Sequence, residues 1–379
     1  MFPFQGLAFA YVLASKTHTS TVDGKGEIPL HTGTMWALVK DKPEQGLTMK
    51  RVEIPAVGDN DVMIEIHKTA ICGTDVHIWD WNPWAQETIR LGTTAGHEYV
   101  GHIVEMGKNV QGHHVGELVS GEGHIVCGMC RNCRSGRGHL CKGTQGVGVN
   151  RNGAFAQYLV IPASNVITCS PKVPEELYAI FDPFGNAAHT ALSFNLLAED
   201  VLVTGAGPIG IMAAAIAKFS GARNVVITDL NDYRLNLARQ FGVTAVNTAR
   251  TNLQDVMSRL GIHQGFDVGM EMSGSPVALR QLIGAMYNGG HIALLGLPSQ
   301  NMVELPLNTI IWNGLTLKGI YGREMYETWY KMQAMVEGGF PLERIITHRF
   351  SVEDYRQGFE AMISGRSGKV ILDWSNLQS

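Results

Sequence analysis

Four of the six cysteines lie close together in the chain, at Cys127, Cys130, Cys133 and Cys141. Thiolates at this spacing can form a closed tetrahedral shell around one zinc ion. A closed shell leaves no open position for a substrate, so the spacing predicts a structural metal that holds a loop poor in apolar residues. An iron–sulfur cluster is the alternative, because it also takes four cysteines.

A second set of potential metal ligands is spread along the chain. Cys72 lies in the run A-I-C-G-T-D-V-H, and His97 and Glu98 lie in G-H-E-Y-V-G. Each residue taken singly could be an ordinary core group. Together they offer one thiolate, one imidazole and one carboxylate, which suits a catalytic zinc with an exchangeable position.

Two side chains that can carry a proton follow Cys72. Thr74 offers a hydroxyl, and His77 offers an imidazole whose ordinary pKa of roughly 6.5 suits proton transfer near neutral pH. Beside the second set of metal ligands, this pair predicts a proton relay to solvent. The alternative is that both residues simply cap a turn.

A strand-like run, V-L-V-T, leads into G-A-G-P-I-G and then into an alanine-rich segment. In this strand–turn–helix context the motif predicts a dinucleotide site. Gly205 makes the tight turn, Gly207 admits the pyrophosphate, and Gly210 lets helix and strand pack closely. Pro208 and Ile209 begin the helix, whose free N–H groups favour phosphate.

The next predicted strand ends at Asp229. A carboxylate at this place accepts the ribose hydroxyls of NAD and repels the 2′-phosphate of NADP, so NAD is the expected cofactor. Asp229 could instead cap the following helix. Arg234 is a further cofactor-binding candidate, and it is the residue that could hold a 2′-phosphate.

The elements around these residues fall into two classes. Up to about residue 163, short strands and glycine-rich turns predict a β-rich domain, and Val62, Ile64 and Ile66 indicate a half-buried strand within it. From about residue 175, six strands alternate with helical stretches, which predicts a doubly wound parallel α/β sheet. The six strands are 201–204, 224–229, 244–247, 266–272, 291–295 and 316–320; helices are expected at 232–241 and 276–287, and late strands at 345–350 and 369–372.

Composition limits the function classes. The chain has 379 residues, a formal net charge of −4 and a sequence pI of about 6.4. This balance argues against a nucleic-acid or membrane-surface role, which requires basic patches, and no apolar run reaches the roughly 18 residues of a membrane span. Residues 1–34 are expected to be a disordered extension rather than a signal peptide, with Met35 as the working start.

The motif G-H-E-x2-G-x5-G-x2-V, together with the four-cysteine segment, resembles the zinc-containing medium-chain alcohol dehydrogenases. The resemblance implies a GroES-like catalytic domain, a Rossmann domain, NAD, and two zinc ions per chain, one catalytic and one structural. It places Asp182 beside Cys72 and His97 at the catalytic zinc, with Glu98 as a possible exchangeable ligand. It also implies a cytoplasmic homo-oligomer, expected to be a tetramer. The expected boundaries are 1–34, 35–182, 183–321 and 322–379, the last segment returning to the catalytic domain.

Several longer stretches are similar to the threonine-oxidising branch of that family, among them S-G-E-G-H-I-V-C-G-M-C and K-G-I-Y-G-R-E-M-Y-E-T-W-Y-K-M. This resemblance implies L-threonine as substrate, with His124 as a candidate lining residue. The alternatives are a polyol dehydrogenase acting on sorbitol or butanediol, and a non-catalytic relative that binds NAD and zinc. A zinc-ribbon nucleic-acid module is disfavoured by the charge balance.

Overall fold

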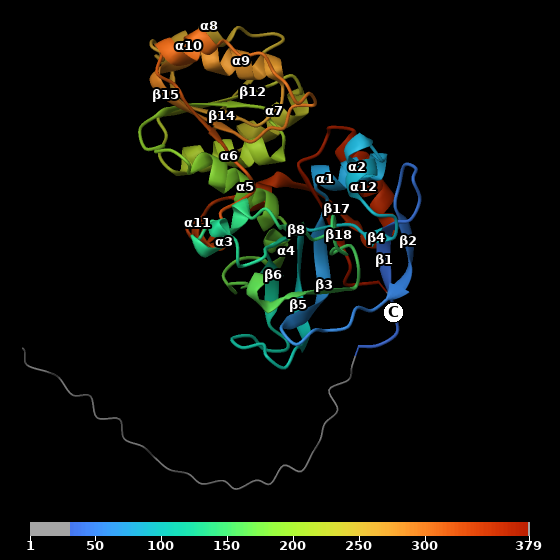
Figure 1. Ribbon diagram of the computed structural model, residues 1–379. Coiled ribbons are helices and arrows are strands. Elements are labelled where there is room, and N and C mark those ends of the chain that lie inside the picture. The colour runs from blue at the N-terminus through green and yellow to red at the C-terminus, as the bar shows by residue number, and fades with distance from the viewer. Residues whose placement is uncertain (1–30, 378–379) are drawn as a thin grey trace, which may run out of the picture. The chain divides into compact units, whose positions relative to one another are not determined.

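The computed structural model describes residues 31–377 (Figure 1). The predicted extension, residues 1–34, therefore falls almost entirely outside the described residues. In the part that is described, no helix is both long enough and apolar enough to cross a membrane.

The first part of the chain is rich in β-structure. A three-stranded sheet has the order β2-β1-β4, and a seven-stranded sheet has the order β10-β6-β5-β3-β18-β17, with β9 also paired to β3. Val62, Ile64 and Ile66 are buried as predicted, and Met63 is buried as well. The strands are β1 Thr34–Lys40, β2 Thr48–Glu53, β3 Asp61–Ala70, β4 Thr93–Thr94, β5 Tyr99–Met106, β6 Leu118–Gly121, β7 His124–Ile125, β8 Gln145–Gly146, β9 Tyr158–Pro162 and β10 Val166–Thr168.

Short helices and turns link these strands and carry much of the chemistry. They are α1 Gly73–Asp80, α2 Pro83–Thr88, α3 Arg131–Arg134, η1 Gly138–Leu140, η2 Ala163–Asn165 and α4 Glu175–Tyr178. The longer helix α5, Phe181–Ala191, is almost wholly buried and packs against α6 and α11.

The second part is the predicted doubly wound sheet. Its six strands are all parallel and have the order β13-β12-β11-β14-β15-β16. Strands β12 and β13 are added to one side of β11, and β14, β15 and β16 to its other side, so the order of addition switches between β11 and β14. The strands are β11 Asp200–Thr204, β12 Asn224–Asp229, β13 Thr244–Asn247, β14 Phe266–Glu271, β15 Met286–Leu294 and β16 Thr316–Gly319. The helices are α6 Pro208–Phe219, α7 Asp232–Arg239, α8 Leu253–Leu260, α9 Pro276–Gly284 and α10 Leu307–Trp312.

Both helices whose bounds the sequence predicts are shorter in the structure: α7 ends at Arg239 instead of residue 241, and α9 is cut back further. The prediction ran to Tyr287, but α9 ends at Gly284, because Met286 already pairs with Phe266 as the first residue of β15. Strand pairing with a buried neighbour overrides the local helical pattern here.

The last segment adds its strands to the first sheet. It contains α11 Glu327–Glu337, η3 Leu342–Ile345, β17 Ile346–Ser351, η4 Val352–Asp354, α12 Tyr355–Ile363 and β18 Lys369–Asp373. Strand β18 runs antiparallel to β3 and parallel to β17, and Figure 1 shows these red strands beside blue β3. The carboxyl end of the chain therefore supports the strand that leads into Cys72.

Candidate functional site

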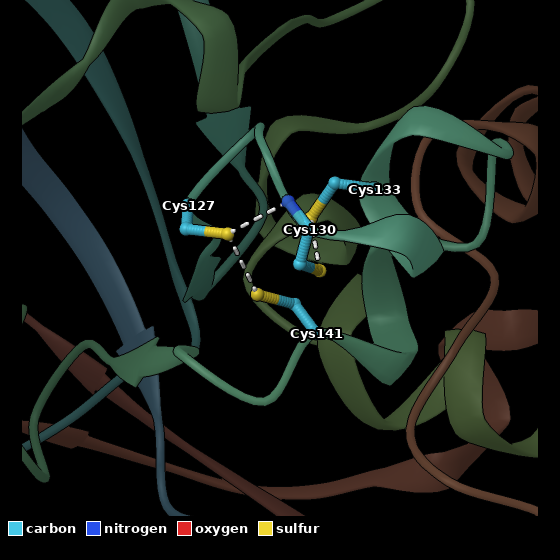
Figure 2. A group of neighbouring side chains, drawn as sticks. All are labelled: Cys127, Cys130, Cys133 and Cys141. Carbon is cyan, nitrogen blue, oxygen red and sulfur yellow. Dashed lines mark hydrogen bonds between the residues drawn. The ribbon is translucent and has the colours of Figure 1, made fainter.

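The four clustered cysteines converge on one point (Figure 2). Their sulfur atoms lie within 4.8 Å of one another, and the Cys130–Cys133 and Cys127–Cys141 pairs are 3.5 Å apart. Tetrahedral zinc at Zn–S of about 2.3 Å requires sulfurs about 3.8 Å apart, so the cluster fits that ion. Backbone hydrogen bonds lower the pKa of Cys141 to about 6, whereas burial raises the pKa of Cys133 in the same cluster to about 12, so the geometry rather than the pKa values carries the metal assignment.

The second predicted set is also brought together. Ligand atoms of Cys72, His97 and Glu98 lie within 4.8 Å of one another. Cys72 is the N-cap residue of α1, and the other two immediately precede β5. His97 Nδ1 and Glu98 Oε1 are buried and have no hydrogen-bond partner within the described part of the chain. Buried polar atoms without partners are costly, and a metal ion with this donor set would satisfy them.

Two buried charges that the sequence did not single out surround this set. Asp75 accepts hydrogen bonds from Cys72 N at 2.9 Å and Gly96 N at 3.3 Å, and its Oδ1 lies 3.8 Å from His97 Nδ1. Lys369 Nζ lies 2.6 Å from Glu98 Oε2. Burial raises the pKa of Glu98 to about 7, although Lys369 opposes that rise.

Asp182 lies beside the set but pairs elsewhere. Its Oδ1 is 2.7 Å from Arg323 Nη2, and it is not among the atoms grouped within 4.8 Å. A Cβ added to Gly123 would lie 3.6 Å from Asp182 Oδ1 and 3.7 Å from His97 Cβ, so Gly123 lies between the two side chains.

A buried ion-pair network adjoins Asp182. Arg323 binds both oxygens of Glu122, and Trp329 Nε1 donates to Glu122 Oε2 at 3.1 Å. Burial alone would raise the pKa of Glu122, but Arg323 and His124 outweigh it and lower the value to about 2. His124 Nδ1 lies 3.2 Å from Glu122 Oε1, so the predicted substrate-lining histidine belongs to this network.

Thr74 and His77 occupy the first two turns of α1, three residues apart and thus on one helix face. Thr74 is half-buried and His77 is exposed. His77 Nδ1 lies 3.0 Å from Asn82 Nδ2, so Asn82 contacts the ring through that nitrogen. The capping function that was the alternative belongs to Asp75, whose side chain accepts the Cys72 N–H.

The glycine motif has the geometry that a dinucleotide loop requires. Gly205 has φ +98°, and a Cβ on Gly210 would lie 2.0 Å from Gly205 O, so neither position accepts a side chain. A Cβ on Gly207 would meet no atom within 4 Å, which leaves its backbone open to a ligand. Pro208 and Ile209 form the first turn of α6, whose N-terminus faces this opening.

Asp229 ends β12 next to that loop. Its Oδ2 accepts from Ala206 N at 2.6 Å, and its Oδ1 accepts from Leu230 N and Asn231 N. The cap of α7 is Asn231 rather than Asp229, because the Asn231 side chain accepts the N–H groups that open that helix. Arg234 lies on α7, and its buried Nε has no partner among the described residues.

A mostly apolar cavity of about 380 Å³ opens beyond the carboxyl ends of β14, β15 and β16. Doubly wound sheets bind their ligands at this edge. The cavity is lined by Glu271, Gly274–Pro276, Leu279, Leu294–Pro298, Val303 and Gly319–Tyr321.

Comparison with known proteins agrees with this geometry. Residues 58–172 match the alcohol dehydrogenase GroES-like domain, and residues 208–338 match the zinc-binding dehydrogenase family. The chain is 62% identical over 342 residues to L-threonine 3-dehydrogenase of Burkholderia ambifaria, covering 90% of this chain and 100% of that protein. The chain belongs to the L-threonine 3-dehydrogenase family of zinc-binding alcohol dehydrogenases.

Solved structures of the wider family share the fold. A protein from Escherichia coli CFT073, described as a short chain alcohol dehydrogenase and solved with NADH, has a TM-score of 0.82 at 25% identity, covering 90% of this chain and 99% of that one. A putative zinc-binding dehydrogenase from Sinorhizobium meliloti 1021, bound to NADP, has a TM-score of 0.81 at 25% identity, with the same coverage. These two similar structures hold different cofactors, NADH and NADP, so the choice between NAD and NADP in this chain must be argued from its own residues.

Proposed function

We propose that this protein oxidises the β-hydroxyl of L-threonine with NAD, giving 2-amino-3-oxobutanoate, NADH and a proton. The observation that carries the proposal is the convergence of Cys72, His97 and Glu98 in a family member whose curated relatives are L-threonine 3-dehydrogenases. Zinc bound there supplies a Lewis acid that lowers the pKa of the substrate hydroxyl. The four-cysteine cluster holds a second, structural zinc.

Cys72 and His97 are the proposed permanent ligands, with Glu98 as the exchangeable one. Lys369 Nζ lies 2.6 Å from the Glu98 carboxylate, so Glu98 would have to leave this ammonium group to bind the metal. Asp182 is engaged by Arg323 at 2.7 Å, which supports a role beside the metal rather than on it.

Thr74 and His77 are proposed to carry the hydroxyl proton to solvent. Thr74 is half-buried two residues after Cys72, while His77 lies about one helical turn further along and is exposed. An exposed imidazole can exchange its proton with bulk water, which a buried group cannot do directly.

The charges near the metal set favour an amino acid over a polyol. The carboxylates of Glu122 and Asp182, the guanidinium of Arg323 and the imidazole of His124 form one connected network. A zwitterion offers both an ammonium and a carboxylate group to such a network, whereas sorbitol and butanediol are uncharged. His124, at the edge of this network, is proposed to hold the substrate carboxylate.

Asp229 supports NAD over NADP, because a carboxylate at the end of β12 repels a 2′-phosphate. Arg234, on the following helix, is proposed to contact the same ribose. The thiolate ligands require a reducing compartment, so we place the enzyme in the cytoplasm.

The second sheet supports assembly into a homo-oligomer, which we propose is a tetramer. Strand β16 is an edge strand with one partner, β15. Large apolar side chains are exposed on the segments around it, with Leu297 at 91%, Met302 at 84% and Trp312 at 81%. An open edge beside an exposed apolar surface fits a second copy of this chain.

Turnover with different alcohols tests the proposed substrate. We expect NADH formation, followed by absorbance, to show kcat/KM for L-threonine at least about 100-fold above that for sorbitol or butane-2,3-diol, a discrimination of about 2.7 kcal/mol. Equal values for a polyol would favour the polyol dehydrogenase. No turnover of any of these alcohols by zinc-loaded protein would favour the non-catalytic relative.

A further inference from the structure

A connected group of titratable side chains lies on the seven-stranded sheet, outside the active site. His67 of β3 and His102 of β5 approach with His67 Nε2 3.3 Å from His102 Nδ1, and their ring centroids are 4.6 Å apart. Glu175 Oε1, at the start of α4, lies 3.0 Å from His67 Nδ1. None of these residues has a part in the proposed reaction.

The local backbone turns the two rings toward each other. In the β3–β5 pairing, Ile66 opposes Gly101 and Lys68 opposes Val100, so His67 is the extra residue of a β-bulge. A bulge re-aims the side chain that it carries.

The separation of the two nitrogens suits a metal ion. Two imidazole nitrogens bound at about 2.05 Å in tetrahedral geometry lie about 3.3 Å apart. The observed 3.3 Å equals that spacing and is longer than the roughly 2.9–3.0 Å typical of a hydrogen bond. The ring geometry therefore accommodates a shared ion as well as a long N–H···N hydrogen bond.

Glu175 prepares His67 for this role. When His67 Nδ1 donates its proton to the carboxylate, the lone pair remains on Nε2, the atom that faces His102. Carboxylate–histidine–metal arrangements of this kind fix the tautomer and raise the basicity of the ligand. Burial and the neighbouring His67 lower the pKa of His102, which favours the neutral ring that a metal requires.

A third side chain stands near the pair, and the site is open to solvent. Glu65 lies directly opposite His102 in the strand register and is exposed. Residues directly opposite on antiparallel strands have Cβ atoms about 4.5–5.5 Å apart. The Glu65 carboxylate does not lie within 4.8 Å of both imidazole nitrogens, so its exposed side chain would have to turn to reach a shared ion. The His67 side chain is 29% exposed, so an ion can enter from solvent and water can complete its shell.

We propose that His67 and His102 form a third metal site in this chain, with Glu65 as the third ligand and Glu175 as the orienting carboxylate. Two imidazoles and one carboxylate select a divalent transition metal such as Zn²⁺ or Ni²⁺ over Mg²⁺ or Ca²⁺. The ion would join β3, which ends two residues before Cys72, to β5, which begins one residue after Glu98. Its occupancy clamps the two strands that deliver the active-site residues.

Nickel binding to enzyme that carries two zinc ions per chain, one for the Cys72 set and one for the four-cysteine set, tests this site. We expect one more Ni²⁺ per chain in the wild type than in His102→Gln, measured by equilibrium dialysis and metal analysis. The melting temperature of the wild type should rise with Ni²⁺, because an ion that binds only the folded state stabilises it. His263→Gln, which removes an exposed histidine elsewhere, is the matched control and should behave as the wild type.

Two further variants distinguish a metal site from a simple chain of hydrogen bonds. Glu175→Gln should weaken nickel binding by about 10–100-fold while keeping the stoichiometry. His67→Gln should lose the additional ion, as His102→Gln does. Threonine oxidation without nickel should be unchanged in all four variants, which shows that they fold. Equal nickel binding by the wild type and both histidine variants would overturn the proposal and leave only a hydrogen-bonded pair.

Discussion

At the scale of single residues, the candidate active site is organised by buried charges of opposite sign. The Cys72–His97–Glu98 set is flanked by the carboxylate of Asp75 and the ammonium of Lys369, both at most 2% exposed. Buried charges persist only when they are paired, so each holds a neighbour in a fixed place. Asp75 fixes the backbone of Cys72, and Lys369 fixes the carboxylate of Glu98.

Cys72→Ser tests the catalytic metal. A serine hydroxyl is a poor zinc ligand at neutral pH, so we expect one zinc to be lost and turnover to fall by more than about 1,000-fold, or about 4 kcal/mol. NAD binding, measured by fluorescence titration, should change little because the glycine loop lies on another sheet. Cys169→Ala removes a buried thiol outside both metal groups and should keep its activity and zinc. Full activity in Cys72→Ser would rule out the proposed mechanism.

His77→Asn tests the proton relay. The change keeps the metal ligands but removes the exposed proton acceptor, so turnover should fall by about 10–100-fold. Partial recovery is expected at higher pH, where solvent hydroxide takes over. A pH–rate profile of the variant that matches the wild type would remove His77 from the mechanism and leave the metal site intact.

The sequence predicted the side chains with a local signature and missed those defined by distant contacts. Cysteine spacing and the glycine motif identified groups that the structure brings together. Arg323 and Glu122 meet across 201 residues, and Lys369 reaches Ile71 across 298. No local pattern marks such partners, because their role exists only after the sheets have formed.

At the scale of elements, the four-cysteine segment is a lobe with little core of its own. Helix α3 has no buried residue, and Met129 is 78% exposed. A segment that buries so little apolar surface needs another source of order, which a metal shell provides.

Cys127→Ser tests this dependence. We expect zinc content to fall from two ions per chain to one and the melting temperature to drop by several degrees, since metal-binding free energy here is folding free energy. Metal analysis and calorimetry measure both effects. Unchanged zinc content and melting temperature would argue against a structural zinc.

Asp229→Gly tests the end of β12. Removing the carboxylate should weaken NAD binding by about 10-fold. It should also reduce the difference in kcat/KM between NAD and NADP, because the repulsion of the 2′-phosphate is lost. Steady-state kinetics with each cofactor measure this ratio. A wild type that turns over faster with NADP at equal concentration would show that Asp229 does not set the preference.

The alternating α/β half was the most predictable part of the fold. Its strands are short and buried and are separated by helices, so periodicity located all six. The end of α9 was wrong because Met286 joins a sheet that local propensity cannot foresee. The pairing of β18 with β3 joins segments about 300 residues apart, and the family resemblance, rather than any local pattern, anticipated it.

At the scale of the whole molecule, the candidate site is assembled from three distant stretches of chain. The β-rich part supplies Cys72 and His97, the loop after β16 supplies Arg323, and β18 supplies Lys369. Because these stretches come together only in the complete fold, the site depends on the packing of both sheets. The exposed apolar surface around β16 is not covered by the described residues of one copy of the chain.

Trp312→Lys tests whether that surface is an interface between copies. Trp312 ends α10 and is 81% exposed, and Ile311 beside it is 63% exposed, so neither contributes much to the core. A lysine there should leave the fold intact but place a charge in a desolvated interface, which costs several kcal/mol. We expect light scattering after size exclusion to show a smaller particle for Trp312→Lys and for Ile311→Lys. Val115→Lys, at another exposed apolar position, should keep the mass of the wild type. If Trp312→Lys and Ile311→Lys also keep that mass, the copies do not associate through β16 and α10, and the open edge must be covered in another way.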